Sequence, residues 1–148
     1  MSAVFKRILV GCNGTPEAED AVEVAIGLAA GIGAKVVLLG VATPPSAESQ
    51  AEGYGLEDPA KVKQRLHEQL TRLAGVAKEQ GVEAVVEVVD GDAEEQLERH
   101  ATDEHADLIV VGWRHVSQLR HWLEHSTSEA LLRRATTSVL VVRSPEKK

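Results

Sequence analysis

The sequence has few aromatic residues, a single cysteine and no long apolar run, and each absence excludes a class of protein. Aromatic residues make up 3% of the chain, so the core must be aliphatic. The lone cysteine, Cys12, excludes an internal disulfide and favours a reducing compartment. No apolar run approaches the ~20 residues that cross a bilayer, and the N-terminus lacks a secretory signal. We therefore expect a cytoplasmic protein.

Basic residues are also fewer than acidic residues. Lys and Arg number 16 against 23 Asp and Glu, which gives a net charge of −7. Nucleic acids and anionic membranes favour a basic surface, so neither is expected as the main partner. With 148 residues, 43% of them apolar, the chain has the size and composition of one globular domain, residues 1–148.

Short apolar runs alternate with segments of helical periodicity along the chain. We expect strands at residues 5–10, 35–41, 82–89, 108–111 and 139–142. Four helices between them have start signals at Thr15-Pro16, at Asp58-Pro59, at Asp92 with Glu95, and at Ser126 with Glu129. Gly31 and Gly33 are expected to stop the first helix, and Gly81 the second. This alternation predicts an α/β fold with a parallel, doubly wound sheet.

In such folds ligands bind at the carboxyl ends of the strands. The segments to consider are residues 11–15, 42–57 and 113–125. The second, from Ala42 to Glu57, is too long for an ordinary connection, and we interpret it as either a flap over a ligand or a mobile loop.

Several motifs occur together in the order found in one known family. They are the stretch Ile8-Leu-Val-Gly-Cys-Asn-Gly-Thr15, Gly91-Asp92, Ala106-Asp-Leu-Ile-Val-Val-Gly112, Ser126-Thr-Ser-Glu-Ala130 and Val139-Leu-Val-Val142. With these motifs the chain resembles a universal stress protein of the UspA superfamily over nearly its whole length. The resemblance implies the adenine nucleotide alpha hydrolase-like fold, with five strands in the order 3-2-1-4-5. It also implies a ligand cleft between strands one and four.

The ATP-binding branch of this family carries the motif Gly-x2-Gly-x9-Gly-Ser/Thr after the fourth strand. On this chain the motif falls on Gly112, His115, His125 and Ser126, so the spacing is kept while histidine replaces two glycines. The family's aspartate after the first strand falls on Asn13. The resemblance thus implies an ATP or AMP-type site, modified by these changes. Its predicted residues are Asn13, Gly14, Thr15, Val41, Gly112, Arg114, His115, His125, Ser126, Thr127 and Ser128.

The loop after the fourth strand, residues 113–125, is basic and allows three interpretations. Its arginines and histidines form an anion site, or the loop is simply solvated. Ser126 caps the helix that follows, and this role is compatible with a phosphate contact. A third interpretation takes His121, Glu124 and His125 as the H-x-x-E-H motif of a metal-dependent hydrolase. Against it, the N-cap at Ser126 interrupts the continuous helix that this motif needs.

We find no nucleophile and base arranged for catalysis, and expect at most weak nucleotide hydrolysis. Two functions remain open within the family. One is a regulatory module that binds an adenine nucleotide, and the other is a nucleotide-free interaction module with a closed cleft and an unknown protein partner. In either case the resemblance implies a homodimer that pairs through the last strand, from Thr137 to Arg143.

Overall fold

The structure is a computed structural model that describes residues 4–42, 58–112 and 137–143. Residues 43–57, predicted as flap or mobile loop, lie outside the described residues. The same holds for the basic loop and for the start of the fourth helix at Ser126.

Strands and helices alternate along the described chain. The elements are β1 (Arg7–Cys12), α1 (Pro16–Ile32), β2 (Lys35–Ala42), α3 (Pro59–Glu79), β3 (Ala84–Asp90), α4 (Ala93–Asp103), β4 (Leu108–Gly112) and β5 (Ser138–Val142). All five strands are parallel and lie in the order β3-β2-β1-β4-β5. The predicted fold class and strand order are confirmed.

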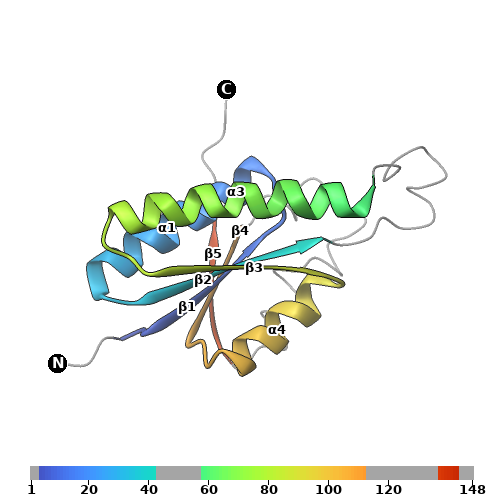
Figure 1. The fold of residues 1–148 in the computed structure, drawn as a ribbon. Coiled ribbons are helices and arrows are strands. Elements are labelled where there is room, and N and C mark those ends of the chain that lie inside the picture. The colour runs from blue at the N-terminus through green and yellow to red at the C-terminus, as the bar shows by residue number, and fades with distance from the viewer. Residues whose placement is uncertain (1–3, 43–57, 113–136, 144–148) are drawn as a thin grey trace.

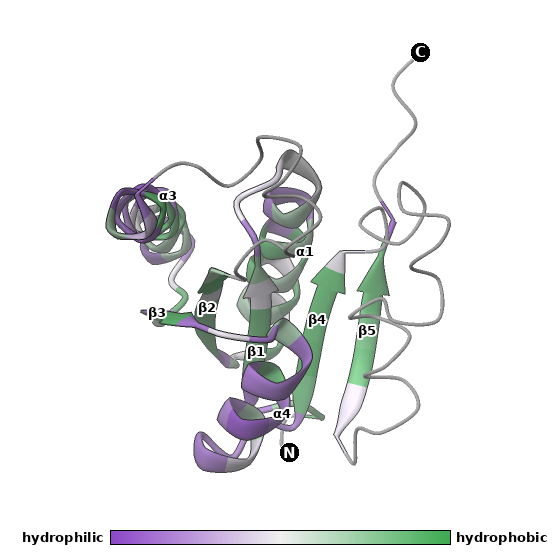
Figure 2. Cartoon of the chain, turned by 90° about the vertical axis from the view of Figure 1, so that its right-hand side faces the viewer, coloured by the Kyte–Doolittle hydropathy of each residue, from purple (hydrophilic) through white to green (hydrophobic). Residues whose placement is uncertain are grey.

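The helices cover both faces of the sheet. Figure 1 shows α1 and α3 on one face and α4 on the other. The buried residues accordingly form two clusters, a large one under α1 and α3 and a smaller one under α4. In Figure 2 the strands are mainly apolar, whereas α4 is largely hydrophilic. Within the described ranges no helix is long and apolar enough to span a membrane.

The predicted helix starts in the described residues are confirmed. Thr15, Asp58 and Asp92 are N-caps whose side chains accept a hydrogen bond from the first turn of α1, α3 and α4. The proposed stop at Gly31 is wrong, because α1 continues through it to Ile32. Gly33 ends the helix with φ +75°. Glycine adopts this left-handed conformation without strain, whereas residues with a side chain rarely do.

The predicted strand positions hold to within two residues. β1 begins two residues later than the apolar run, since its pairing with β2 starts at Arg7, opposite Lys35. The apolar side chain of Phe5 still packs against the large core cluster, which explains why the run begins earlier than the strand.

Candidate functional site

The turn between β1 and α1 contains three of the predicted site residues. Oδ1 of Asn13 accepts hydrogen bonds from the backbone N–H (3.1 Å) and the hydroxyl (2.7 Å) of Thr15. Thr15 Oγ1 accepts in turn from the N–H of Ala18 (3.3 Å), as the N-cap of α1. Gly14 has φ +87°, where a side chain would introduce strain. The three residues form one hydrogen-bonded unit at the N-terminus of α1.

The ends of β2 and β4 lie on either side of this turn. β1 pairs with β2 as far as Cys12, opposite Gly40, so Val41 lies one residue beyond that pair. The β1–β4 register, continued to the end of β4, brings Gly112 level with Cys12. The side chain of Val41 is buried in the cluster under α4. Both residues thus lie at the same edge of the sheet as the turn.

The structure therefore brings together five predicted site residues, namely Asn13, Gly14, Thr15, Val41 and Gly112. The other predicted residues lie outside the described ones. They are Arg114, His115, His125, Ser126, Thr127 and Ser128, together with His121 and Glu124 of the metal interpretation. In the described ranges no group of three or more His, Cys, Asp or Glu side chains is placed to hold a metal ion.

The residue beneath the turn is Cys12, which is buried as expected. Burial raises the pKa of its thiol, and a hydrogen bond with the backbone of Gly14 only partly offsets this effect. A buried thiol with a raised pKa stays protonated and is a poor nucleophile. Cys12 is thus a small apolar residue in the floor of the site.

Two glycines allow helices to approach the strand ends closely. A Cβ atom on Gly40 would lie 2.8 Å from side-chain carbons of Leu66, so α3 packs directly on the end of β2. On the opposite face, a Cβ atom on Gly11 would lie 3.1 Å from Leu97 of α4. The side chain of Gln69 also lies against the turn, 3.6 Å from the Cβ position of Gly14. The edge between β1 and β2 is therefore held by helices on both faces.

The same edge continues at the end of β3. Asp90, the last residue of β3, forms an ion pair with Lys63 of α3 (3.1 Å). The next residue, Gly91, donates its N–H to the carbonyl of Ala42 at the end of β2 (3.3 Å). The charge of Asp90 at this edge of the sheet is thus balanced by a cation.

The sequence analysis missed a cluster of titratable side chains on the α4 face. Nε2 of His100 on α4 lies 3.5 Å from Oε2 of Glu87 on β3, and Glu104 at the end of α4 helps to raise the pKa of Glu87, after the effect of burial. A sequence signal for it is weak, because 13 residues separate the glutamate from the histidine and only the packing of α4 on β3 brings them together. The strand alternation, which places a charged residue among valines, is the one visible hint.

The comparisons with known proteins agree with the fold. The sequence profile described as the universal stress protein family matches residues 5–143. The chain therefore belongs to the universal stress protein family, whose members have the adenine nucleotide alpha hydrolase-like fold.

Individual relatives match over most of their length. The chain is 28% identical over 145 residues to a universal stress protein of Methanocaldococcus jannaschii, covering 97% of this chain and 85% of the relative. It is 30% identical over 144 residues to a putative universal stress protein of Staphylococcus aureus, covering 96% and 86%. Among solved structures, a universal stress protein in complex with cAMP is similar with a TM-score of 0.73 and 25% identity, covering 95% of this chain and 98% of that one.

Proposed function

We propose that this protein is a regulatory universal stress protein that binds an adenine nucleotide between the ends of β1 and β4. The observation that carries the proposal is the Asn13-Gly14-Thr15 unit at the N-terminus of α1, flanked by Val41 and Gly112. The cAMP complex of a similar universal stress protein supports an adenine nucleotide as the ligand.

Each described residue has a role in this proposal. Asn13 holds the turn and faces the adenosine end, and the main chain of Val41 meets the base. Gly112 lets the ribose and phosphates approach the backbone, since it has no side chain. Phosphate contacts are assigned on motif spacing alone, to Arg114, His115, His125, Ser126, Thr127 and Ser128.

The proposed mode of action is binding rather than turnover. The thiol of Cys12, at the end of β1, is buried and has a raised pKa, and the hydroxyl of Thr15 is engaged in the cap of α1. We therefore expect at most weak nucleotide hydrolysis, from one domain in a homodimer. The cytoplasmic location and a protein partner stay predictions of the sequence.

The sequence also favours a second candidate, a nucleotide-free interaction module. Its support is the pair of histidines, His115 and His125, at positions where the ATP-binding motif has glycine. Under this candidate the two side chains fill the cleft, and the protein acts through a partner protein alone.

Two measurements separate the candidates. Freshly purified protein is extracted with acid and any released nucleotide is identified by chromatography, and calorimetry then measures the binding of ATP, AMP and cAMP. The first candidate predicts a bound or binding adenine nucleotide, and the second predicts none. If the histidines fill the cleft, the double variant His115→Gly with His125→Gly should gain at least about tenfold in ATP affinity, or about 1.4 kcal/mol. A folded double variant that binds no ATP would reject that explanation.

A further inference from the structure

The strand β3 has an open edge among the described residues, because it pairs only with β2, on one side. Figure 2 shows β3 as the outermost strand, beside α3. On the paired side, Val36 of β2 donates its N–H to the carbonyl of Glu83 (2.9 Å), just before β3. Successive residues of a strand direct their backbone groups to opposite sides. Three residues therefore point their N–H and C=O groups to the open edge, namely Ala84, Val86 and Val88.

Both faces of this edge have room for apolar side chains. On the α4 face, Val85 is 51% exposed, although it is a large apolar residue. It lies on that face because it pairs with Val37, which packs against the cluster under α4. On the α3 face, an open hollow of about 550 Å³ adjoins Ala84, the first residue of β3. Its lining includes two small residues of α3, Ala74 and Gly75. A strand added to this edge would thus bury apolar surface on both faces.

A negative charge lies between two valines on the α4 face of the edge. Glu87 alternates with Val85 and Val89 along β3, and its side chain is 32% exposed. Nε2 of His100 lies 3.5 Å from Oε2 of Glu87, and this contact joins opposite charges only when the imidazole is protonated. The edge therefore presents an acidic group between apolar ones.

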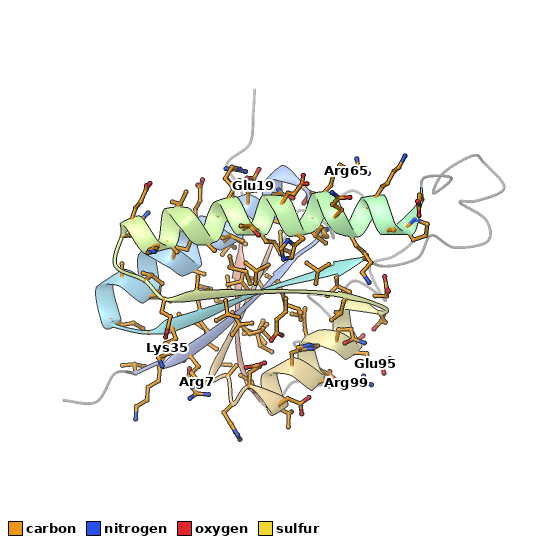
Figure 3. All side chains as sticks on the ribbon, in the orientation of Figure 1. Arg7, Glu19, Lys35, Arg65, Glu95 and Arg99 are labelled. Carbon is orange, nitrogen blue, oxygen red and sulfur yellow. The ribbon has the colours of Figure 1, made fainter. Side chains whose placement is uncertain are left out.

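The surroundings of Glu87 are acidic as well. Three cations near the edge are each paired with a carboxylate, in the pairs Lys35–Glu83 (3.3 Å), Lys63–Asp90 (3.1 Å) and Arg99–Glu95 (3.0 Å). Figure 3 shows Glu95 and Arg99 on the outer side of α4. Lys78 lines the hollow, on the opposite face of the sheet from Glu87. Residues 93–104 contain five acidic residues and one arginine. This face therefore attracts a cationic partner.

The same charge argues against a second copy of this chain as the occupant of the edge. In an antiparallel pair of two β3 strands centred on Val86, the two Glu87 side chains would lie diagonally opposite each other, within reach of repulsion. The other edge strand of the sheet, β5, has no charged residue from Val139 to Val142. A second copy therefore suits β5, whereas β3 suits a partner with a basic side chain beside Glu87.

We propose that the open edge of β3 binds an extended segment of a partner protein as an added strand. The backbone of the segment pairs with the outward N–H and C=O groups of β3. On the α4 face the segment places a basic side chain beside Glu87 and apolar side chains beside Val85 and Val89. On the other face an apolar side chain enters the hollow. The proposal depends neither on the binding of a nucleotide nor on pairing through β5.

The test uses the full-length protein and two capped, fluorescently labelled peptides. One is Thr-Val-Leu-Lys-Leu-Val-Thr, which reads the same in both directions, and the other has glutamate in place of the lysine. Fluorescence anisotropy is measured at about 0.15 M salt, which screens distant charges. The lysine peptide should bind at least about tenfold more tightly than the glutamate peptide, and Glu87→Lys should reverse this preference. The control Glu23→Lys changes the net charge equally on the exposed face of α1 and should keep the wild-type preference.

Amide exchange on the unmodified protein locates the bound peptide. Excess lysine peptide should slow the exchange of the N–H groups of Ala84, Val86 and Val88 at least about tenfold, and should leave β5 unchanged. Val86→Pro removes one outward N–H group without removing a pair with β2, so it should weaken the binding of the lysine peptide.

Four results would overturn the proposal. They are no binding of the lysine peptide, equal binding of the two peptides, an effect of Glu23→Lys as large as that of Glu87→Lys, and protection that lies away from β3. The first, second and fourth are measured on the wild type, so they decide the question even if a variant does not fold.

Discussion

At the scale of single residues, Asn13 has one structural role, in the turn after β1, and one proposed role in ligand binding. Its side chain closes the turn through Thr15, and the proposed ligand lies beyond it. We expect Asn13→Ala to weaken adenine nucleotide binding by at least about tenfold, because the unit that faces the adenosine end loses its internal hydrogen bonds. Calorimetry on the wild type and the variant measures the change. Glu79→Gln, an exposed change in the last turn of α3 at the opposite edge, should bind like the wild type. Equal affinity of Asn13→Ala and wild type would remove Asn13 from the site.

Gly40 offers a second prediction at this scale, about stability. A Cβ atom there would lie 2.8 to 2.9 Å from carbons of Leu66 and Leu70, which are both buried. Gly40→Ala should therefore lower the free energy of unfolding by about 1 to 3 kcal/mol, the usual cost of overpacking a core. Urea unfolding checks this value. Gly75→Ala is the matched control, since a Cβ at Gly75 of α3 meets no atom within 4 Å, and it should be neutral or stabilising. If both variants were equally stable, α3 would not pack on β2 as described.

At the scale of elements, the contribution of an N-cap to stability can be measured on α4. Asp92 accepts a hydrogen bond from the N–H of Glu95 (2.9 Å) at the N-terminus of this 11-residue helix. Asp92→Ala should lower the free energy of unfolding by about 0.5 to 2 kcal/mol. Asp103→Asn is the control in the last turn, where removing a negative charge should be neutral or slightly stabilising, because it lies at the negative end of the helix dipole. A destabilised Asp103→Asn with an unaffected Asp92→Ala would contradict this account of the helix.

The elements also show what the sequence could predict and why. The positions of the described strands and the starts of the described helices follow from local signals, such as the cap at Thr15 and the apolar runs, so they were predicted to within two residues. The end of α1 was ambiguous because two glycines, Gly31 and Gly33, lie two residues apart, and only the backbone conformation distinguishes them.

The functional residues also include some that the sequence predicted and some that it did not. The Asn13 turn is a local unit and was predicted from its motif, and the placement of Val41 and Gly112 beside it follows from parallel strand order. The contact of Glu87 with His100 was not predicted, because it depends on how α4 packs on β3 and no short-range pattern encodes that.

At the scale of the whole molecule, the prediction concerns the strand at the end of the sheet. β5 is last in the strand order, and Val139, Leu140 and Val141 are half-buried on it. An apolar edge strand without proline presents unpaired backbone groups that can pair with a second copy. We expect a homodimer through β5, so light scattering should give about twice the 15.9 kDa of the chain.

Two variants of β5 test the dimer. Val141→Pro removes a backbone N–H from the strand and should shift the mass toward that of a monomer. Val139→Lys is the second variant, because a charge on the edge opposes pairing without changing the backbone. Circular dichroism must show that each remains folded, since β5 also pairs with β4. Glu79→Gln should keep the wild-type mass, as it lies on α3, away from β5. A wild type that stays monomeric at high concentration, or folded variants that both remain dimeric, would place the interface elsewhere or remove it. A monomeric wild type that still bound an adenine nucleotide would show in addition that the site between β1 and β4 is complete within one chain.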